Sequence, residues 1–321
     1  MHKLFLMSAV AIGLMSFDVQ ASDKLDGWVE SFKKDAIKKG ISEKVVDEAM
    51  KGFSPNARII ELDRKQPEGT MTFAKYQKRV ISDARIAQGR RLYKEHRDLL
   101  DKTAAKYGVP AQYIVALWGI ETSYGNNTGG FNVPHALATL AYDGRRSSFF
   151  RKELMNALKI IDAGHIDGAT MKGSWAGAMG QNQFMPSSFH AYAVDGNDDG
   201  KRDIWTSLPD VFASTANYLS KSGWKEDQLW GRRVVLPKSF TKDMIGLDVK
   251  RDLTTWKKLG VMLPGGSAIP VVDGMKASVV APDGLSGPAY LAYDNYRVIM
   301  RWNKSTYFAT SVGLLADSIA Q

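Results

Sequence analysis

The first hundred residues carry apolar side chains at the spacing of α-helices. Two amphipathic stretches show this spacing, and Gly40 is suited to end the first while Ser42 is suited to cap the second. Their apolar positions are Trp28, Phe32, Ala36, Val45, Val46, Ala49 and Met50. A charged, periodic run follows from Thr72 to Lys102. The pattern predicts an N-terminal helical domain over residues 22–100.

The next part of the chain, residues 101–229, alternates helical stretches with Gly-rich loops. Its most apolar helix is predicted between Pro110, which fits a first helical position, and Gly125, which fits a stop. The apolar body of this helix is Ile114, Val115, Leu117, Trp118 and Ile120. Glu121 lies at its end, where a carboxylate is either paired or desolvated with a raised pKa. A raised carboxylic acid can protonate a glycosidic oxygen, whereas the alternative is a surface Glu at a helix C-terminus.

After Trp230 the pattern becomes that of short strands separated by Gly- and Pro-containing turns. Three β-like runs are Val234–Leu236, Ala277–Val280 and Arg297–Met300. They predict a small β-rich domain over residues 230–300. The last segment, residues 301–321, contains an amphipathic helix from Tyr307 to Ala320 that we expect to pack back on the core. The fold class predicted is α+β, mainly α.

The first 21 residues have the charged start, apolar stretch and small-residue end of a secretory signal peptide. We expect cleavage after Ala21; an uncleaved anchor is the alternative. The apolar stretch is too short to span a membrane comfortably, and no other run of about 18 apolar residues occurs. The mature protein is therefore predicted to be periplasmic, soluble and not membrane-spanning.

Composition narrows the chemistry further. The chain has no cysteine, which excludes disulfides, thiolate metal sites, cysteine nucleophiles and the thiol to which a bacterial lipoprotein attaches its lipid. The net charge is +9, and the predicted signal peptide carries one Lys and one Asp, so cleavage leaves it unchanged. A basic exported protein suits an anionic cell-wall polymer, and no nucleic-acid motif is present. The alternative is that the charge mainly aids solubility.

A second motif lies fifty residues after Glu121, from Lys172 to Ser188. Its small residues let the backbone approach a ligand closely. Apolar faces for sugar rings come from Trp175, Phe184 and Met185, and hydrogen-bonding groups come from Ser174, Gln181, Asn182 and Gln183. This mixture favours a carbohydrate cleft, although a Gly-rich packing loop has a similar composition.

The helix end Ile120–Thr122, the run Gly173–Gly180 and the run Gln183–Ser188 resemble the lytic murein transglycosylase B family. The likeness extends from about Leu25 to Leu315. It implies a lysozyme-like helical core over residues 101–229, no organic cofactor and peptidoglycan glycan strands as the partner. It also implies cleavage of the MurNAc-β-1,4-GlcNAc bond that leaves a 1,6-anhydro-MurNAc end, with Glu121 as acid and then base. We further expect a monomer.

The resemblance also implies roles for individual substrate-binding residues. Ser174 would orient the carboxyl of Glu121, Phe184 would offer an apolar face, and the remaining contacts would be Tyr76, Gln183, Tyr218, Asn303 and Tyr307. Phe308 stands where some relatives have a second tyrosine, so a hydrogen bond from that position is not expected. For each tyrosine the alternative is a core position with a satisfied hydroxyl.

The segment from Asp195 to Lys201 opens like an EF-hand loop, with oxygen ligands at loop positions 1, 3 and 5 and Gly at position 6. The predicted ligands are Asp195, Asn197, Asp199, the Lys201 carbonyl and, by the resemblance, Asp210. Position 12 is Thr206, so the usual bidentate Glu is missing. We therefore expect weakly bound, structural calcium; the alternative is a solvated acidic turn.

Two other functions stay open. A hydrolytic muramidase would need a second acid beside Glu121, and the candidates are Asp143, Asp162 and Asp167. A non-catalytic murein-binding protein would have lost the acid, which is present here. The five histidines lack metal-binding spacing, and no Gly-x-Ser-x-Gly motif occurs.

Overall fold

The structure is a computed structural model, and it describes residues 12–65 and 71–321. The described chain divides into two units, each assembled from separate stretches of sequence. Unit 1 comprises the chain up to Lys65 together with residues 129–178 and 185–187, and unit 2 comprises the remainder. The domain boundaries inferred from sequence stay a prediction. Residues 1–11 of the predicted signal peptide lie outside the described residues.

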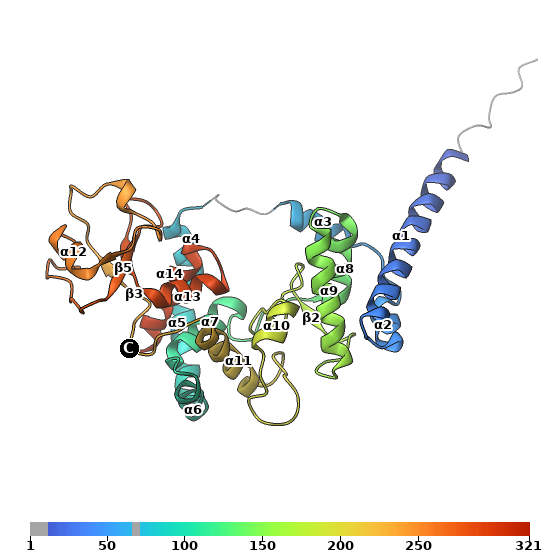
Figure 1. Cartoon of the computed structure of the whole chain (residues 1–321), viewed down its shortest axis with the longest axis horizontal. Coiled ribbons are helices and arrows are strands. Elements are labelled where there is room, and N and C mark those ends of the chain that lie inside the picture. The colour runs from blue at the N-terminus through green and yellow to red at the C-terminus, as the bar shows by residue number, and fades with distance from the viewer. Residues whose placement is uncertain (1–11, 66–70) are drawn as a thin grey trace, which may run out of the picture. The chain divides into compact units, whose positions relative to one another are not determined.

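Unit 1 is a set of helices with one short antiparallel sheet (Figure 1). Its elements are α1 (Ile12–Lys38), α2 (Glu43–Met50), α3 (Ala57–Arg64), β1 (Phe131–Asn132), α8 (Val133–Asp143), α9 (Ser147–Asp162) and β2 (Lys172–Gly173). The stop predicted at Gly40 is confirmed, because this residue has φ +84° just after α1. Ser42 does occupy the N-cap of α2, but its hydroxyl donates to Asp162 and not back to the helix.

Unit 2 contains the longer set of helices and a second sheet. Its helices are α4 (Phe73–Val80), α5 (Asp83–Glu95), α6 (Arg97–Tyr107), α7 (Ala111–Thr122), α11 (Leu208–Lys221), α12 (Leu253–Lys258), α13 (Asp294–Trp302), α14 (Thr306–Ile319) and the 3₁₀ turn η1 (Lys242–Met244). Helix α10 (Pro186–Tyr192) begins in unit 1 and ends in unit 2. Helix α7 packs against α5 and α14, and α14 spans most of the segment Tyr307–Ala320 that was predicted to form a helix.

A small antiparallel sheet covers one end of unit 2, in the strand order β3-β6-β5-β4. Its strands are β3 (Gly231–Val234), β4 (Arg251–Asp252), β5 (Lys276–Val280) and β6 (Ala289–Ala292). A separate core lies beneath it, with Phe240, Trp256 and Leu291 among its buried residues. The mainly helical α+β class predicted from sequence is confirmed.

One predicted strand is wrong. Arg297–Met300 lies inside helix α13, whereas β4 and β6 of this sheet were not predicted. The buried side chains of α13 are Asn295, Tyr296, Val298 and Ile299. These positions repeat at helical spacing. The predicted run Arg297–Met300 covers only four residues, which is too short to show that period.

Among the described helices, none is both long and apolar enough to cross a membrane.

Candidate active site

Glu121 lies in the last turn of α7, a mostly buried helix of unit 2, and is itself partly exposed. Its Oε1 accepts a hydrogen bond of 2.8 Å from the indole Nε1 of Trp302. Burial raises the pKa of the carboxyl to about 7, against a smaller opposing effect of this hydrogen bond. Desolvation therefore outweighs the donor, because the charged form loses more solvation than one N–H returns. Near neutral pH the group is present as both acid and base.

The backbone beyond Glu121 is held in an uncommon conformation. Ser123 and Tyr124 both have positive φ, at 51° and 60°. Arg85 donates to the Ser123 hydroxyl at 2.9 Å, and the Tyr124 hydroxyl donates to the Arg85 carbonyl at 2.8 Å. Left-handed residues other than Gly cost about 1–3 kcal/mol each and persist only where surrounding contacts hold them. The end of α7 is thus fixed by contacts with α5.

An aromatic group surrounds the indole that meets Glu121. The ring of Trp302 lies 5.2 Å from that of Phe184 and 4.7 Å from that of Tyr218, between centroids. Tyr218 is buried, and its hydroxyl donates to the Arg301 carbonyl at 2.7 Å. These contacts match the alternative given for each tyrosine, a core position with a satisfied hydroxyl. Contact between Tyr218 and sugar stays a prediction.

Two further tyrosines from the sequence prediction lie together. The rings of Tyr76 and Tyr307 are 5.7 Å apart, and the latter also meets Phe73 at 5.3 Å. Burial raises the pKa of Tyr76, and the charge of Glu121 adds to this effect, so the structure brings these two groups within electrostatic range. Asn303 follows α13, where its Oδ1 accepts from the backbone N–H of Ser305 at 3.0 Å.

The second sequence motif divides between the units, because residues 172–178 belong to unit 1 and residues 179–184 to unit 2. In unit 1, the Ser174 hydroxyl accepts from the Ala178 N–H at 3.1 Å. In unit 2, Gln183 has φ 51°, and its Nε2 donates to the carbonyls of Thr128 and Gly180 at 3.1 and 2.9 Å. The predicted bond from Ser174 to Glu121 stays a prediction.

Trp302 is the contact of Glu121 that the sequence reading did not single out. Trp302 begins the run Trp302–Phe308, which contains the predicted site residues Asn303 and Tyr307. Its indole N–H, a hydrogen-bond donor beside those residues, was the only sign of such a role in the sequence. The partner of that N–H could not be read from the chain, since 181 residues separate it from Glu121.

The predicted calcium loop has the turn geometry that its sequence requires. The carboxylate of Asp195 accepts from the N–H groups of Asp199 and Gly200, and Gly200 has φ +87°. The carboxylate oxygens of buried Asp210 each accept one backbone N–H, from Gly196 at 2.8 Å and Asp203 at 2.6 Å. Each oxygen keeps a second lone pair. No cluster of three acidic or His side chains gathers in the described residues, so calcium binding by this loop stays a prediction.

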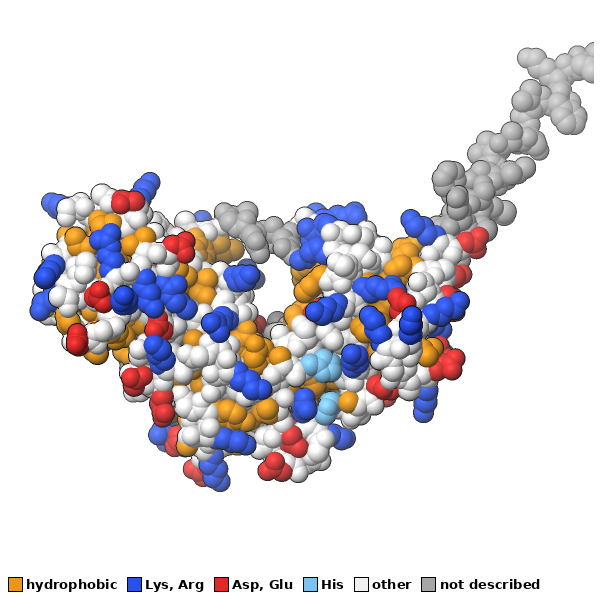
Figure 2. Space-filling model, in the orientation of Figure 1, with side chains coloured by type: hydrophobic (Ala, Val, Ile, Leu, Met, Phe, Trp, Pro, Cys, Tyr) orange, Lys and Arg blue, Asp and Glu red, His pale blue; other side chains and the backbone are white. Residues whose placement is uncertain are grey.

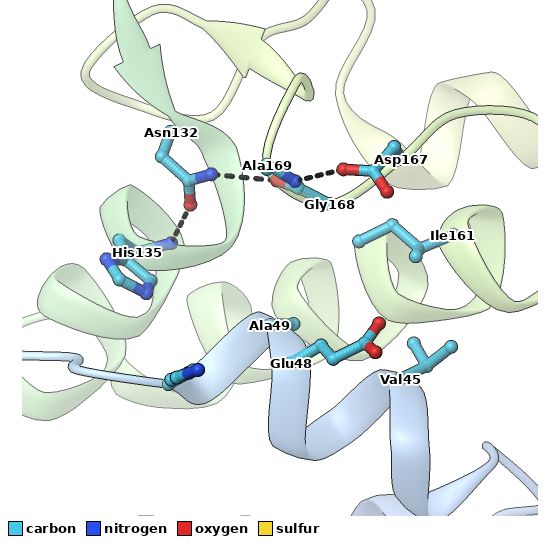
Figure 3. A pocket seen from close by; sticks show the side chains of 10 residues that line it. Val45, Glu48, Ala49, Asn132, His135, Ile161, Asp167, Gly168 and Ala169 are labelled. Atoms are coloured by element: carbon cyan, nitrogen blue, oxygen red, sulfur yellow. Dashed lines mark hydrogen bonds between the residues drawn. The ribbon is translucent and has the colours of Figure 1, made fainter.

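A separate hollow of about 590 Å³ lies within unit 1 (Figure 3). Figure 3 shows Val45 and Glu48 on α2 and Ile161 at the end of α9 along its wall, with His135 and Asp167 also lining it. None of these residues was predicted to bind substrate or metal.

Comparison with known proteins identifies the class. The model of the family described as Transglycosylase SLT domain matches residues 24–317, and the chain belongs to this family. It is accordingly a lytic transglycosylase of peptidoglycan, which confirms the family predicted from the sequence motifs.

Individual relatives share most of the chain. Membrane-bound lytic murein transglycosylase B of Escherichia coli (strain K12) is 34% identical over 265 residues, covering 80% of this chain and 70% of that protein. SltB3 from Pseudomonas aeruginosa in complex with NAG-NAM-pentapeptide is 42% identical with a TM-score of 0.89, covering 92% and 79%. The Escherichia coli lytic transglycosylase Slt35 in complex with calcium is 28% identical with a TM-score of 0.79, covering 91% and 92%.

Proposed function

We propose that this chain cleaves the MurNAc-β-1,4-GlcNAc bond of peptidoglycan without hydrolysis, leaving a 1,6-anhydro-MurNAc end, with Glu121 as acid and then base. The observation that carries the proposal is the partly buried carboxyl of Glu121, hydrogen-bonded to Trp302, whose pKa desolvation raises to about 7. An acid–base group works best when its pKa lies near the operating pH, because both forms are then populated.

The proton balance needs one carboxyl. In the first step protonated Glu121 gives its proton to the glycosidic oxygen, and the C1–O4 bond breaks with its electron pair on the departing GlcNAc. In the second step the Glu121 carboxylate takes the proton of the MurNAc C6 hydroxyl while O6 bonds to C1. Glu121 ends protonated and no water is consumed. Ordinary glycosidases need a second carboxylate to activate water or form a covalent intermediate.

The hydrolytic alternative has less support. Its candidate second acids already have partners within unit 1: Asp143 pairs with Arg64, Asp162 accepts from Ser42 and Asp167 accepts from its own loop. The raised pKa of Glu121 arises from burial, opposed by Trp302. Neither influence involves a neighbouring carboxylate.

For binding, we propose that aromatic faces, hydroxyls and amide groups hold the glycan. The proposed contacts are Tyr76, Ser174, Gln183, Phe184, Tyr218, Asn303 and Tyr307. The relative SltB3 was crystallised in complex with NAG-NAM-pentapeptide, and this complex supports the proposed class of ligand. We further propose a periplasmic monomer after cleavage at Ala21, with weak structural calcium in the Asp195–Asp210 loop; the complex of Slt35 with calcium supports the last point.

The test is digestion of purified sacculi followed by mass spectrometry of the soluble products. Anhydro ends, lighter than reducing ends by one water, are expected from the wild type. Glu121→Gln should lose roughly 10²–10⁴-fold in rate, because the amide cannot exchange the proton. Asp143→Asn is the control and should keep wild-type products. Reducing ends would establish hydrolysis instead, and Glu121→Gln within about threefold of wild type would remove Glu121 from the chemistry.

A further inference from the structure

Gln181 is a nearly buried amide, 9% exposed, that bonds to the helix carrying Glu121. Its Oε1 accepts from the indole Nε1 of Trp118 at 2.7 Å. Its backbone carbonyl accepts from the hydroxyl of Thr122 at 3.1 Å. Trp118 lies one helical turn before Glu121, and Thr122 directly follows it. Gln181 thus holds the last turn of α7 at two points.

The other side of Gln181 bonds to the end of the Asp195–Asp210 loop. Its Nε2 donates to the Trp205 carbonyl at 2.9 Å, and its backbone N–H donates to the Ile204 carbonyl at 2.8 Å. The Trp205 N–H donates to Asp203, whose own N–H donates to buried Asp210. A continuous chain of hydrogen bonds therefore connects Asp210 to α7.

Two glycines allow this close arrangement. A Cβ on Gly125 would lie 2.3 Å from Gln181 Oε1, and a Cβ on Gly180 would lie 2.6 Å from the Ile204 carbonyl oxygen. Both glycines also have positive φ, at 82° and 65°. The backbone of Gly125 consequently lies close against the Gln181 amide, and the backbone of Gly180 lies close against Ile204.

We propose that Gln181 is a positioning residue for Glu121, which fixes the last turn of α7 against the Asp195–Asp210 loop. The inference rests on the proposed role of Glu121 and deepens it. A buried hydrogen-bond network whose groups are satisfied rigidifies the segments that it joins. Displacing a reacting group by about 1 Å costs on the order of 10²-fold in rate, so a loosened α7 end should slow the reaction.

The test compares Gln181→Met, which removes the amide at similar side-chain length, with Trp118→Phe, which deletes one of its bonds. On soluble peptidoglycan strands, Gln181→Met should lower kcat about 10–100-fold with KM within about threefold, and should displace the pH limb of Glu121. Trp118→Phe should act in the same direction. The double variant should lose less than the product of the two effects, because both remove the same bond.

Asn295→Ala is the matched control, since this buried amide bonds to the Lys225 and Gln228 backbone and not to α7. It should lower Tm while kcat per folded molecule stays at the wild-type value. The proposal is overturned if Gln181→Met keeps wild-type kcat and pH profile per folded molecule. If Gln181→Met does not fold, Trp118→Phe with an unchanged kcat and pH profile overturns it equally. An active Glu121→Gln would instead overturn the proposed function, whatever the Gln181 variants do.

Discussion

At the scale of single residues, two opposed effects determine the state of Glu121. Burial disfavours the carboxylate, whereas the N–H of Trp302 favours it. Burial is the larger, which is why the pKa lies near 7 and not below its ordinary value of 4.5. One side chain can then give a proton and recover it near neutral pH without a second carboxylate.

The raised pKa of Glu121 has a consequence for stability. Between about pH 4.5 and 7 the folded protein holds this proton more tightly than the unfolded chain, so stability falls as pH rises through that window. Glu121→Gln removes the penalty. It should raise the free energy of unfolding by up to about 3 kcal/mol above pH 7 and change it little below pH 4. Chemical denaturation of both proteins across pH measures this, and a constant difference would contradict it.

Removing the donor to Glu121 should shift the pH dependence of catalysis. Trp302→Phe keeps a ring beside Phe184 and Tyr218 but deletes the Nε1–H. The pKa of Glu121 should then rise, which moves the alkaline limb of kcat/KM to higher pH. The rate should fall by about 10–100-fold, as for one hydrogen bond to a charged group of about 1.5–3 kcal/mol. An unmoved limb in the measured profile would show that this bond does not tune the carboxyl.

The sequence singled out Glu121 as the candidate acid but did not identify its hydrogen-bond donor. Glu121 was recognisable because an ionisable side chain closes an otherwise apolar helix and lies within a specific motif. Trp302 could not be assigned to it, since the contact depends on how α13 meets α7 and not on any local pattern. Gln181 was visible as a polar residue in a Gly-rich run, while its connection to α7 required the fold.

At the scale of elements, contacts made by Tyr124 hold the end of α7 in place. The ring of Tyr124 folds back over Gly119, and its hydroxyl lies against Gly89 of α5.

The same scale shows where the sequence pattern gave a wrong prediction. Arg297–Met300 has the composition of a strand, but buried Asn295 and Tyr296 extend its period into a helix.

The space over Gly119 can be tested directly. Alanine favours a helix interior over glycine by about 1 kcal/mol. At position 119, however, its Cβ would lie 2.6 Å from the Tyr124 ring, which its hydrogen bond to Arg85 restrains. Gly119→Ala should therefore destabilise by about 1–3 kcal/mol. Gly27→Ala in α1 is the control, with nothing within 4 Å of its Cβ, and should be neutral or stabilising. Equal effects in urea unfolding would mean that Tyr124 moves aside at little cost.

At the scale of the whole molecule, the two main features are the positive net charge and the division of the described chain into two units. Figure 2 shows Lys and Arg side chains spread over the visible face, in keeping with the net charge of +9. The mainly helical class and the family followed from local patterns and motifs. The assignment of Lys172–Ser188 to both units did not, because it depends on long-range contacts such as those of Gly173 with Val133 and Gly180 with Ile204.

Calcium binding should act on the stability of the whole chain and not on its chemistry. A ligand that binds the folded state alone stabilises it by RT ln(1 + [L]/Kd), about 0.4 kcal/mol at Kd and about 1.4 kcal/mol at ten times Kd. Thr206 replaces the bidentate Glu, so millimolar calcium should be needed for a modest rise in Tm. Asp195→Ala should abolish the rise. Asp198→Asn is the control, because it removes the same charge at a loop position that supplies no ligand. Asn also tolerates the positive φ of this residue.

Cleavage of sacculi should continue under chelation, because the proton transfers proposed for Glu121 use its carboxyl alone, and the hydrogen bonds between the loop and α7 run through Gln181, Trp205 and Asp210. Circular dichroism with and without chelator verifies that the protein stays folded during the assay. A chelator that stops cleavage of folded protein would place the ion in the catalytic centre. A rise in Tm that persists in Asp195→Ala would place calcium elsewhere on the chain.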